Sequence, residues 1–226
     1  RLGESHNSIQ RLNRPLEQAT TPSLEALQTY SVAFAEMGKG QYQASVPLWE
    51  RAIAIDPRYA LAHANLGMVL VKLGDVKEAE DHLQTSVRLD PEQYMAHTSL
   101  GELLAKQEKL TEARSHFEQA LRIAPDLQTA RRMLIATYLR SGQSGRALTE
   151  LGAASGKEGL DSSLYTLAAE VYLQNGDAKR AEEYFSKALK LDPSNPRKRT
   201  ALAMSHVSAG KEAALDELQS IAGSDP

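Results

Sequence analysis

Six histidines are the residues of this sequence best suited to bind a metal or move a proton, and four of them are regularly spaced. His63 and His97 lie 34 residues apart, and so do His82 and His116. A metal site carried on one helix needs two histidines four residues apart, and the sequence holds no such pair. We therefore interpret the histidines as packing or surface residues repeated along the chain, and we predict no metal site.

No other group of residues has the spacing of a catalytic or cofactor site. Gly156-Lys157 resembles the end of a phosphate-binding loop, but Leu151 stands where that motif needs glycine, and Glu158 where it needs serine or threonine. No serine, histidine and aspartate lie in the context of a nucleophilic catalyst. Cysteine is absent, which excludes disulfides and thiolate-bound metals. The sequence predicts no catalytic, cofactor-binding or metal-binding residues, and hence a protein that is not an enzyme.

The interval of 34 residues that relates the histidines governs most of the chain. Prolines, glycines, small residues and large residues all recur on it, and five independent rows do not share one period by chance. The rows are Pro57, Pro91, Pro125, Gly159 and Pro193; Gly40, Gly74, Glu108, Gly142, Gly176 and Gly210; Ser45, Ala79, Ala113, Ala147 and Ala181; Trp49, Leu83, Phe117, Leu151 and Phe185; and Ala52, Ser86, Ala120, Ala154 and Ala188.

Each row has a physical role in a unit of two helices. The glycine ends a first helix, because glycine tolerates the left-handed backbone at a helix C-terminus. The proline closes a second helix, since it cannot occupy a helix interior. The two rows of small residues let the helices approach each other, and the large residue between them fills the space. One pair cannot bury its apolar face alone, so neighbouring pairs must stack.

The chain resembles the tetratricopeptide repeat (TPR) family. The resemblance implies an all-α fold, a right-handed superhelical solenoid of stacked antiparallel helix pairs with about five and a half to six TPR units. It rests on Leu66-Gly67, Gly74-Asp75, Ala79, Leu83 and Asp90-Pro91, and again on Ala169, Tyr172, Gly176-Asp177, Ala181, Phe185, Ala188 and Asp192-Pro193. We expect an N-terminal extension or linker at 1–23 and the solenoid at 24–226, with units near 26–59, 60–93, 94–127, 128–161 and 162–195 and a shortened capping unit at 196–222.

Two units depart from the regular pattern. Four glycines between residues 145 and 159 weaken the second helix of the fourth unit, so we expect a short helix over 146–154 and then a loop through Asp161. This unit is either a drifted repeat held by its neighbours, or a hinge or loop shaped for a partner. In the last unit a residue is missing after Gly210, and the second helix expected at 212–222 has one polar face, which suits a cap.

The N-terminal segment lies outside the repeats. Its residues 2–5, 8–10, 15–21 and 23–27 resemble the stretch that precedes the repeats in large bacterial serine/threonine kinases and winged-helix transcriptional regulators. Because the chain starts with Arg1 rather than methionine, we expect a removed leader or a piece of a longer protein. Thr21 or Ser23 is the expected N-cap of the first helix.

TPR superhelices bind ligands on their concave face, which the first helix of each unit lines, and the resemblance implies the same face here. The predicted groove is apolar near its N-terminal end and more polar beyond it. An alternative is that the N-terminal segment folds back over Leu27, Tyr30 and Phe34. The residues predicted to line the groove are Tyr30, Phe34, Met68, Val71, Lys72, Glu102, Lys106, Arg132 and Arg140.

Lys72, Lys106 and Arg140 share the thirteenth position of three successive units. Stacking would space them by roughly 10 Å. Such a row can hold an acidic group of an extended peptide, although a solvated charged edge is the plainer interpretation. Other TPR proteins clamp chaperone tails with Lys and Asn at the fifth and ninth positions. Tyr30 and Phe34 occupy these positions in the first unit, so chaperone C-termini are not the expected ligand.

Composition narrows the partner to a protein. A net charge of −3 argues against nucleic-acid binding, and no apolar run approaches the roughly 18 residues of a membrane span. We expect a soluble, cytoplasmic or extracytoplasmic part of a bacterial protein. The sequence does not determine its oligomeric state. We predict a non-catalytic scaffold or adaptor that binds an extended peptide or helix of a partner protein. The alternatives are a regulatory or sensor tail of a bacterial kinase or transcription factor, and a structural subunit of a larger assembly.

Overall fold

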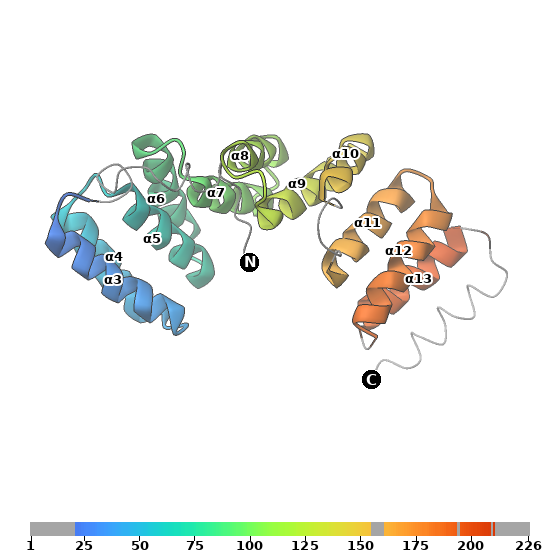
Figure 1. Cartoon of the computed structure of the whole chain (residues 1–226), viewed down its shortest axis with the longest axis horizontal. Coiled ribbons are helices and arrows are strands. Elements are labelled where there is room, and N and C mark those ends of the chain that lie inside the picture. The colour runs from blue at the N-terminus through green and yellow to red at the C-terminus, as the bar shows by residue number, and fades with distance from the viewer. Residues whose placement is uncertain (1–20, 155–160, 194, 209, 211–226) are drawn as a thin grey trace, which may run out of the picture. The chain divides into compact units, whose positions relative to one another are not determined.

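The structure, a computed structural model, describes residues 21–154, 161–193, 195–208 and 210. All regular elements within these residues are α-helices, which pack in consecutive pairs (Figure 1). The chain divides into two compact units, residues 1–125 and 126–226. The first unit contains α3 (Leu24–Gly38) with α4 (Tyr42–Ile55), α5 (Ala60–Leu73) with α6 (Val76–Leu89), and α7 (Tyr94–Lys106) with α8 (Leu110–Ile123). The second contains α9 (Gln128–Arg140) with α10 (Ser144–Ala154), α11 (Ser162–Gln174) with α12 (Ala178–Leu191), and α13 (Pro196–Ser208).

The expected all-α arrangement of helix pairs is confirmed. Helices α5, α7, α9 and α11 begin at Ala60, Tyr94, Gln128 and Ser162, the first residues of expected units, and the division of the chain into these units stays a prediction. Helix α3 begins at Leu24, slightly before the expected start, because the Ser23 hydroxyl caps it by accepting a hydrogen bond from the Ala26 N–H at 3.2 Å. Helix α10 has 11 residues, whereas its counterpart α12 has 14, which agrees with the glycines in its sequence. The expected loop at 155–160, the capping helix at 212–222 and residues 1–20 lie outside the described residues.

Three positions of the second helices α4, α6, α8 and α12 form the centre of the core. In α8 they are Ala113, Phe117 and Ala120, all of them fully buried. Their spacing of four and three residues places them on one face of the helix. The same positions are buried in α4, α6 and α12, where they are Ser45, Trp49 and Ala52; Ala79, Leu83 and Ser86; and Ala181, Phe185 and Ala188. The rows of small and large residues in the sequence therefore correspond to the packed core.

A glycine in the first helix allows the two helices of a pair to touch. A Cβ atom on Gly67 of α5 would lie 2.6 Å from Leu83 Cγ and 3.1 Å from the Ala79 carbonyl oxygen. Gly101 of α7 lies against α8 in the same way, since a Cβ atom at Gly101 would lie 2.7 Å from Phe117 Cε1. No side chain fits at either position without displacing the second helix or its core residue.

A residue in the left-handed conformation turns the chain from the first helix to the second. Gly74 has a φ of 94°, and its N–H donates to the Leu70 carbonyl at 2.9 Å. In the third pair this position holds Glu108, which adopts a φ of 61°. An L side chain in this conformation costs roughly 1–2 kcal/mol, so the geometry of the repeat overrides the local preference of Glu108.

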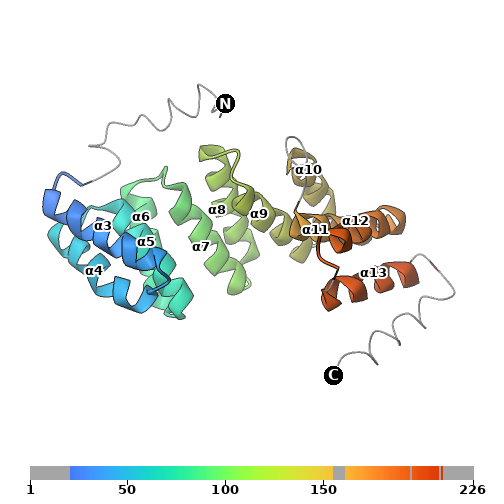
Figure 2. The same cartoon turned by 60° about the horizontal axis from the view of Figure 1, so that its bottom comes forward.

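Some first helices also lie next to each other. Helix α5 packs against α7 as well as against α6 (Figure 2), and α9 packs against α11 as well as against α10. Among the described residues, the second helices of neighbouring pairs do not approach each other to the same degree. The predicted groove residues belong to the first helices α3, α5, α7 and α9, and their place in a groove stays a prediction.

Candidate partner-binding face

Tyr30 is held in place by an aromatic cluster at the start of the first unit. Its ring meets Trp49 edge-on with centroids 5.0 Å apart, and lies 5.2 Å from the ring of Tyr59. Its hydroxyl accepts a hydrogen bond from Asn65 Nδ2 at 3.1 Å, which ties α3 to α5. Burial raises the pKa of the Tyr30 phenol. Tyr30 is thus held rigidly on α3 and has little freedom to rearrange.

Phe34 is the exposed member of this cluster. Its ring stacks on Tyr30 with centroids 6.1 Å apart and an angle of 13° between the planes. Half of its surface, 50%, is open, a large apolar exposure for a side chain on a helix already packed against α4. Leu27, at 36% exposure, lies two helical turns earlier on the same face. Phe34 therefore presents an aromatic surface backed by a fixed tyrosine.

The predicted residues of α5 and α7 continue this face with a different chemistry. Met68 and Val71 are partly buried, and Lys72 is exposed, with no ion pair among the described residues. On α7, Lys106 Nζ lies 3.0 Å from Glu102 Oε1, so these two predicted groove residues neutralise each other. The spacing of four residues between Glu102 and Lys106 is itself a sequence signal for such a pair.

The remaining predicted groove residues belong to the second unit. Arg132 pairs with Asp161 through Nη1 and Oδ2, 2.7 Å apart. Arg140 lies exposed in the last turn of α9. Lys72 and Lys106 belong to the first unit, whereas Arg140 belongs to the second. The predicted basic row would therefore run across both units, and it stays a prediction.

Sequence reasoning missed contacts between residues 19 apart, which join the first and second helix of one repeat. His63 meets His82, His97 meets His116, and Arg131 meets Glu150 in this way. The separation of 19 residues recurs because each pair sits at the same two positions of its repeat. Comparing the two positions across the repeats would have found these contacts, since the paired residue types match each other.

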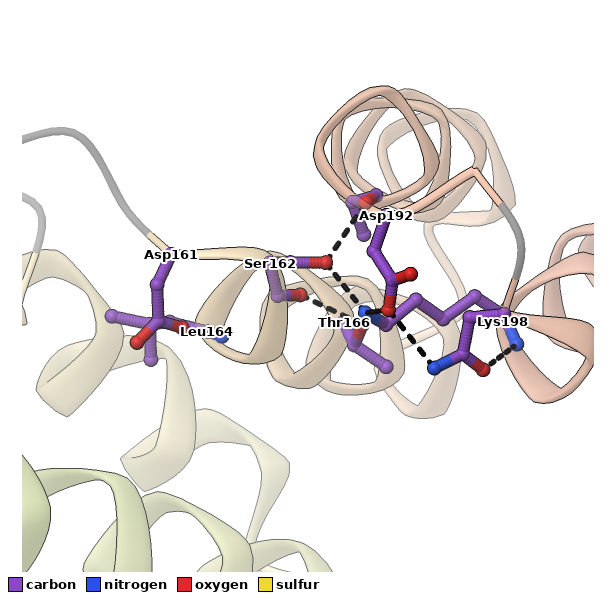
Figure 3. Close-up of polar contacts among 8 residues, drawn as sticks. Asp161, Ser162, Leu164, Thr166, Asp192 and Lys198 are labelled. Atoms are coloured by element: carbon purple, nitrogen blue, oxygen red, sulfur yellow. Dashed lines mark hydrogen bonds and ion pairs between the residues drawn. The ribbon is translucent and has the colours of Figure 1, made fainter.

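A polar cluster joins α11, α12 and α13 in the second unit (Figure 3). Lys198 Nζ donates to Ser162 Oγ at 2.6 Å and to Asp192 Oδ2 at 2.7 Å. The Ser162 hydroxyl donates to the Ala188 carbonyl at 2.8 Å. Hydrogen bonds from Lys198 and Asn195 lower the pKa of Asp192. The Ser162 hydroxyl donates its proton to a carbonyl, and Lys198, which contacts it, is paired with the Asp192 carboxylate. Neither group can act as a base toward Ser162, so this serine is placed for packing and not for nucleophilic attack.

Two further properties bear on function. Among the described residues, no group of three or more histidine, aspartate or glutamate side chains is arranged to hold a metal ion. Within the same residues, no helix combines the length and apolar character needed to cross a bilayer.

Comparison with known families identifies the repeats. A sequence profile described as "Tetratricopeptide repeat" matches residues 66–127 and 133–196. A second, described as "TPR repeat", matches residues 35–74. The matches cover more than half of the chain. No curated protein sequence matches it.

Several solved structures share the fold. A tetratricopeptide repeat protein from Parabacteroides merdae superposes with a TM-score of 0.73 at 14% identity, over 90% of this chain and 82% of its own. PilW, a widely conserved type IV pilus biogenesis factor, has a TM-score of 0.77 at 17% identity, over 88% of this chain and 92% of its own. YrrB, a TPR protein with an unusual peptide-binding site, has a TM-score of 0.67 at 20% identity, over 77% of this chain and 91% of its own. At these identities the likeness concerns the fold alone.

Proposed function

Because the chain belongs to the tetratricopeptide repeat family, we propose that it is a non-catalytic scaffold that binds a segment of a partner protein along its first helices. Proteins with this fold generally mediate protein–protein interactions. The observation that carries the proposal is the half-exposed ring of Phe34, stacked on a Tyr30 that Trp49, Tyr59 and Asn65 hold in place. A rigid aromatic side chain with open surface is the typical anchor of a binding site.

The chemistry of the face defines the segment that it suits. An apolar side chain of the partner would lie on Phe34 and against the partly buried Met68 and Val71 of α5. An acidic group beside it would meet Lys72, the cation of this face that is not offset by a neighbouring carboxylate within the described residues. The best-suited ligand is therefore an extended or helical segment with a large apolar residue next to an aspartate or glutamate.

A library of random peptides tests this proposal and does not require an identified partner. Peptides displayed on phage are selected on the full chain, and the enriched peptides are titrated against variants by fluorescence anisotropy. Phe34→Ala should weaken binding at least tenfold, which corresponds to about 1.4 kcal/mol. Tyr42→Ala is the matched control, since Tyr42 is an exposed aromatic residue on the second helix α4.

The peptides themselves supply the second readout. The proposal expects acidic and apolar residues in the enriched sequences, and a loss of affinity with Lys72→Glu. The predicted basic row adds Lys106→Glu and Arg140→Glu, which should weaken binding further if the row acts as one. Peptides that lose affinity with Tyr42→Ala but not with Phe34→Ala would place the binding site elsewhere and refute the proposal.

A fixed place in a larger assembly is the second candidate, since one structural neighbour is named as a pilus biogenesis factor. Such a role would show as co-purification at constant stoichiometry that salt does not disrupt. The third candidate, a regulatory tail of a bacterial kinase or transcription factor, rests on the N-terminal sequence resemblance. The complete reading frame tests it, because a catalytic or DNA-binding domain must then precede Arg1.

A further inference from the structure

Two histidines join the helices of the second repeat. His63 of α5 and His82 of α6 face each other with Nδ1 atoms 2.9 Å apart, and their ring centroids lie 5.1 Å apart. His63 Nε2 lies 3.2 Å from the Pro57 carbonyl oxygen. His63 is nearly buried, at 7% exposure. The histidine pair therefore replaces apolar packing at this point of contact between the helices.

The third repeat contains the same arrangement. The Nδ1 atoms of His97 and His116 lie 3.0 Å apart, and the ring centroids lie 5.2 Å apart. His97 Nε2 lies 3.1 Å from the Pro91 carbonyl oxygen. The angles between the rings, 36° in the first pair and 37° in the second, are nearly identical. Two independent copies of one geometry indicate a defined interaction rather than incidental contact.

The same two positions carry other matched residues in the later repeats. In the fourth repeat Arg131 Nη1 lies 2.9 Å from Glu150 Oε2, with the two side chains 14% and 26% exposed. In the fifth, the rings of Tyr165 and Tyr184 lie 6.0 Å apart. The repeats thus use three different pairs for one task, which is to hold the first helix against the second. Of these residues, only histidine has an ordinary pKa, about 6.5, that lies between pH 5 and pH 7.

The hydrogen bonds determine where the protons lie at neutral pH. A carbonyl oxygen only accepts, so His63 Nε2 must carry a proton for Pro57. Neutral His63 then has a bare Nδ1, which accepts a hydrogen bond from His82 Nδ1–H. His97 and His116 follow the same rule. A proton added to the bare Nδ1 of His63 or His97 would place two N–H groups head to head at about 3 Å, so the rings must separate.

Charged groups from several elements surround the first pair. Glu50 of α4 and Glu78 and Asp81 of α6 favour protonation of His82, and Glu78 Oε1 lies 4.0 Å from His82 Nε2. Asp56, in the turn before α5, favours protonation of His63, whereas Arg88 of α6 opposes it. Burial outweighs the carboxylates, and the pKa of both histidines falls below its ordinary value.

The second pair has less acidic compensation. Asp90 before α7 favours protonation of His97, and Arg122 of α8 opposes it. The charged side chains of α7, Glu102 and Lys106, pair with each other at its far end. Burial lowers the pKa of His97, and burial together with the neighbouring His97 lowers that of His116 to about 4.

We propose that these histidine pairs make α5–α8 the acid-labile part of the described chain: below about pH 6.5, the histidines of an opened repeat take up protons that the closed pairs cannot hold, so α5 loosens from α6 and α7 from α8. The Arg131–Glu150 and Tyr165–Tyr184 contacts leave α9–α12 intact over the same range. Because α5 and α7 also carry Met68, Lys72, Glu102 and Lys106, the loosening would disrupt the binding face; this last consequence rests on the proposed function.

Hydrogen exchange of the full chain at pH 7.5 and pH 5.0 tests the proposal. Opening constants are obtained at each pH after dividing out the intrinsic exchange rate of each amide. A histidine that stays neutral in the folded protein at pH 5 but titrates near 6.5 when unfolded changes an opening constant about 30-fold. The amides of α8, which carries His116, should show at least this rise, those of α6 a clear rise, and those of α12 less than a threefold rise.

Two sets of variants separate the histidines from the carboxylates. In His82→Asn with His116→Asn, the amide nitrogen replaces the Nδ1 donor and does not titrate, so the acid response of α6 and α8 should shrink in part, because His63 and His97 still titrate. Replacing all four histidines by tyrosine copies the pair of the fifth repeat and removes every titrating ring, so the response should then fall to that of α12. His206→Gln, which removes a histidine paired with Glu182 in the second unit, should leave the response unchanged.

Two results would overturn the proposal. One is an acid response of α6 and α8 no larger than that of α12 in the unmodified chain. The other is an undiminished acid response in either variant; in the tyrosine variant it would be assigned to carboxylates. Peptide affinity plays no part in this experiment, so its outcome is independent of the proposed function.

Discussion

Gly67→Ala is the substitution whose effect the structure defines most sharply. Alanine in place of glycine within a helix normally stabilises it by about 1 kcal/mol. At this site the new Cβ would lie 2.6 Å from Leu83 Cγ and 2.9 Å from Leu83 Cδ2. Ordinary carbon–carbon contacts are about 3.5–4.0 Å, so α5 and α6 must separate or Leu83 must leave its fully buried position.

The magnitude follows from two opposing effects. Overpacking a tight core typically costs about 1–3 kcal/mol. The Ala79 carbonyl oxygen, 3.1 Å from the new Cβ, belongs to the backbone of α6 and cannot rotate away as a side chain can. We therefore place the overpacking cost in the upper part of that range, which leaves a net destabilisation of about 1–2 kcal/mol after the gain in helix propensity.

Urea unfolding measures this difference against a control from the same chain. Gly152 of α10 is exposed, and no described atom beyond its own helix backbone and chain neighbours lies within 4 Å of its would-be Cβ, so Gly152→Ala should stabilise by about 1 kcal/mol. Adding Leu83→Ala to Gly67→Ala should produce a favourable coupling of about 1 kcal/mol or more, because the shorter side chain frees the space. Equal stabilisation by Gly67→Ala and Gly152→Ala would refute the close-packing explanation.

Three further predictions concern the turn, the aromatic cluster and pH. Glu108→Gly should raise the free energy of unfolding by about 1 kcal/mol, because Glu108 has a φ of 61° where its counterparts are glycines; an unchanged urea midpoint would contradict this. Tyr59→Phe should be neutral or stabilising by up to about 1 kcal/mol, since the buried Tyr59 hydroxyl has no hydrogen-bond partner among the described residues. Tyr30→Phe, by contrast, loses the hydrogen bond from Asn65 and should cost about 1 kcal/mol of stability, measured by thermal unfolding. The unfolded state binds more protons than the folded state below pH 6.5, because the folded pKa of each paired histidine is lowered, so stability is complete above about pH 7 and falls toward pH 4. At pH 5 His116 alone should account for a loss of about 2 kcal/mol in calorimetry, and a flat profile from pH 7.5 to 5 would contradict the histidine geometry.

The repeat period by itself determined the fold of this protein and most of its core. Rows such as Ala113, Phe117 and Ala120 were readable without coordinates, because a solenoid repeats the same local packing and each repeat contacts only the neighbouring repeats. The first-helix positions of the predicted groove followed from the same periodicity. The ion pair of Glu102 with Lys106 could also be predicted from the sequence, since the two residues are four positions apart on one helix.

Tertiary structure decided which side chains are free to act. Tyr30 was predicted as a groove residue, which stays a prediction, and the structure shows its ring fixed by Trp49, Tyr59 and Asn65. The row of His63, His82, His97 and His116 was visible as a repeat, and matching residue types 19 positions apart were a signal of pairing, but the geometry of the contacts was not readable from sequence. A contact between residues 19 apart depends on how two helices cross and on the distance between their axes, which Gly67 and Gly101 set by close approach. Sequence spacing records position along one helix, and only the packing of two helices brings one histidine to the next.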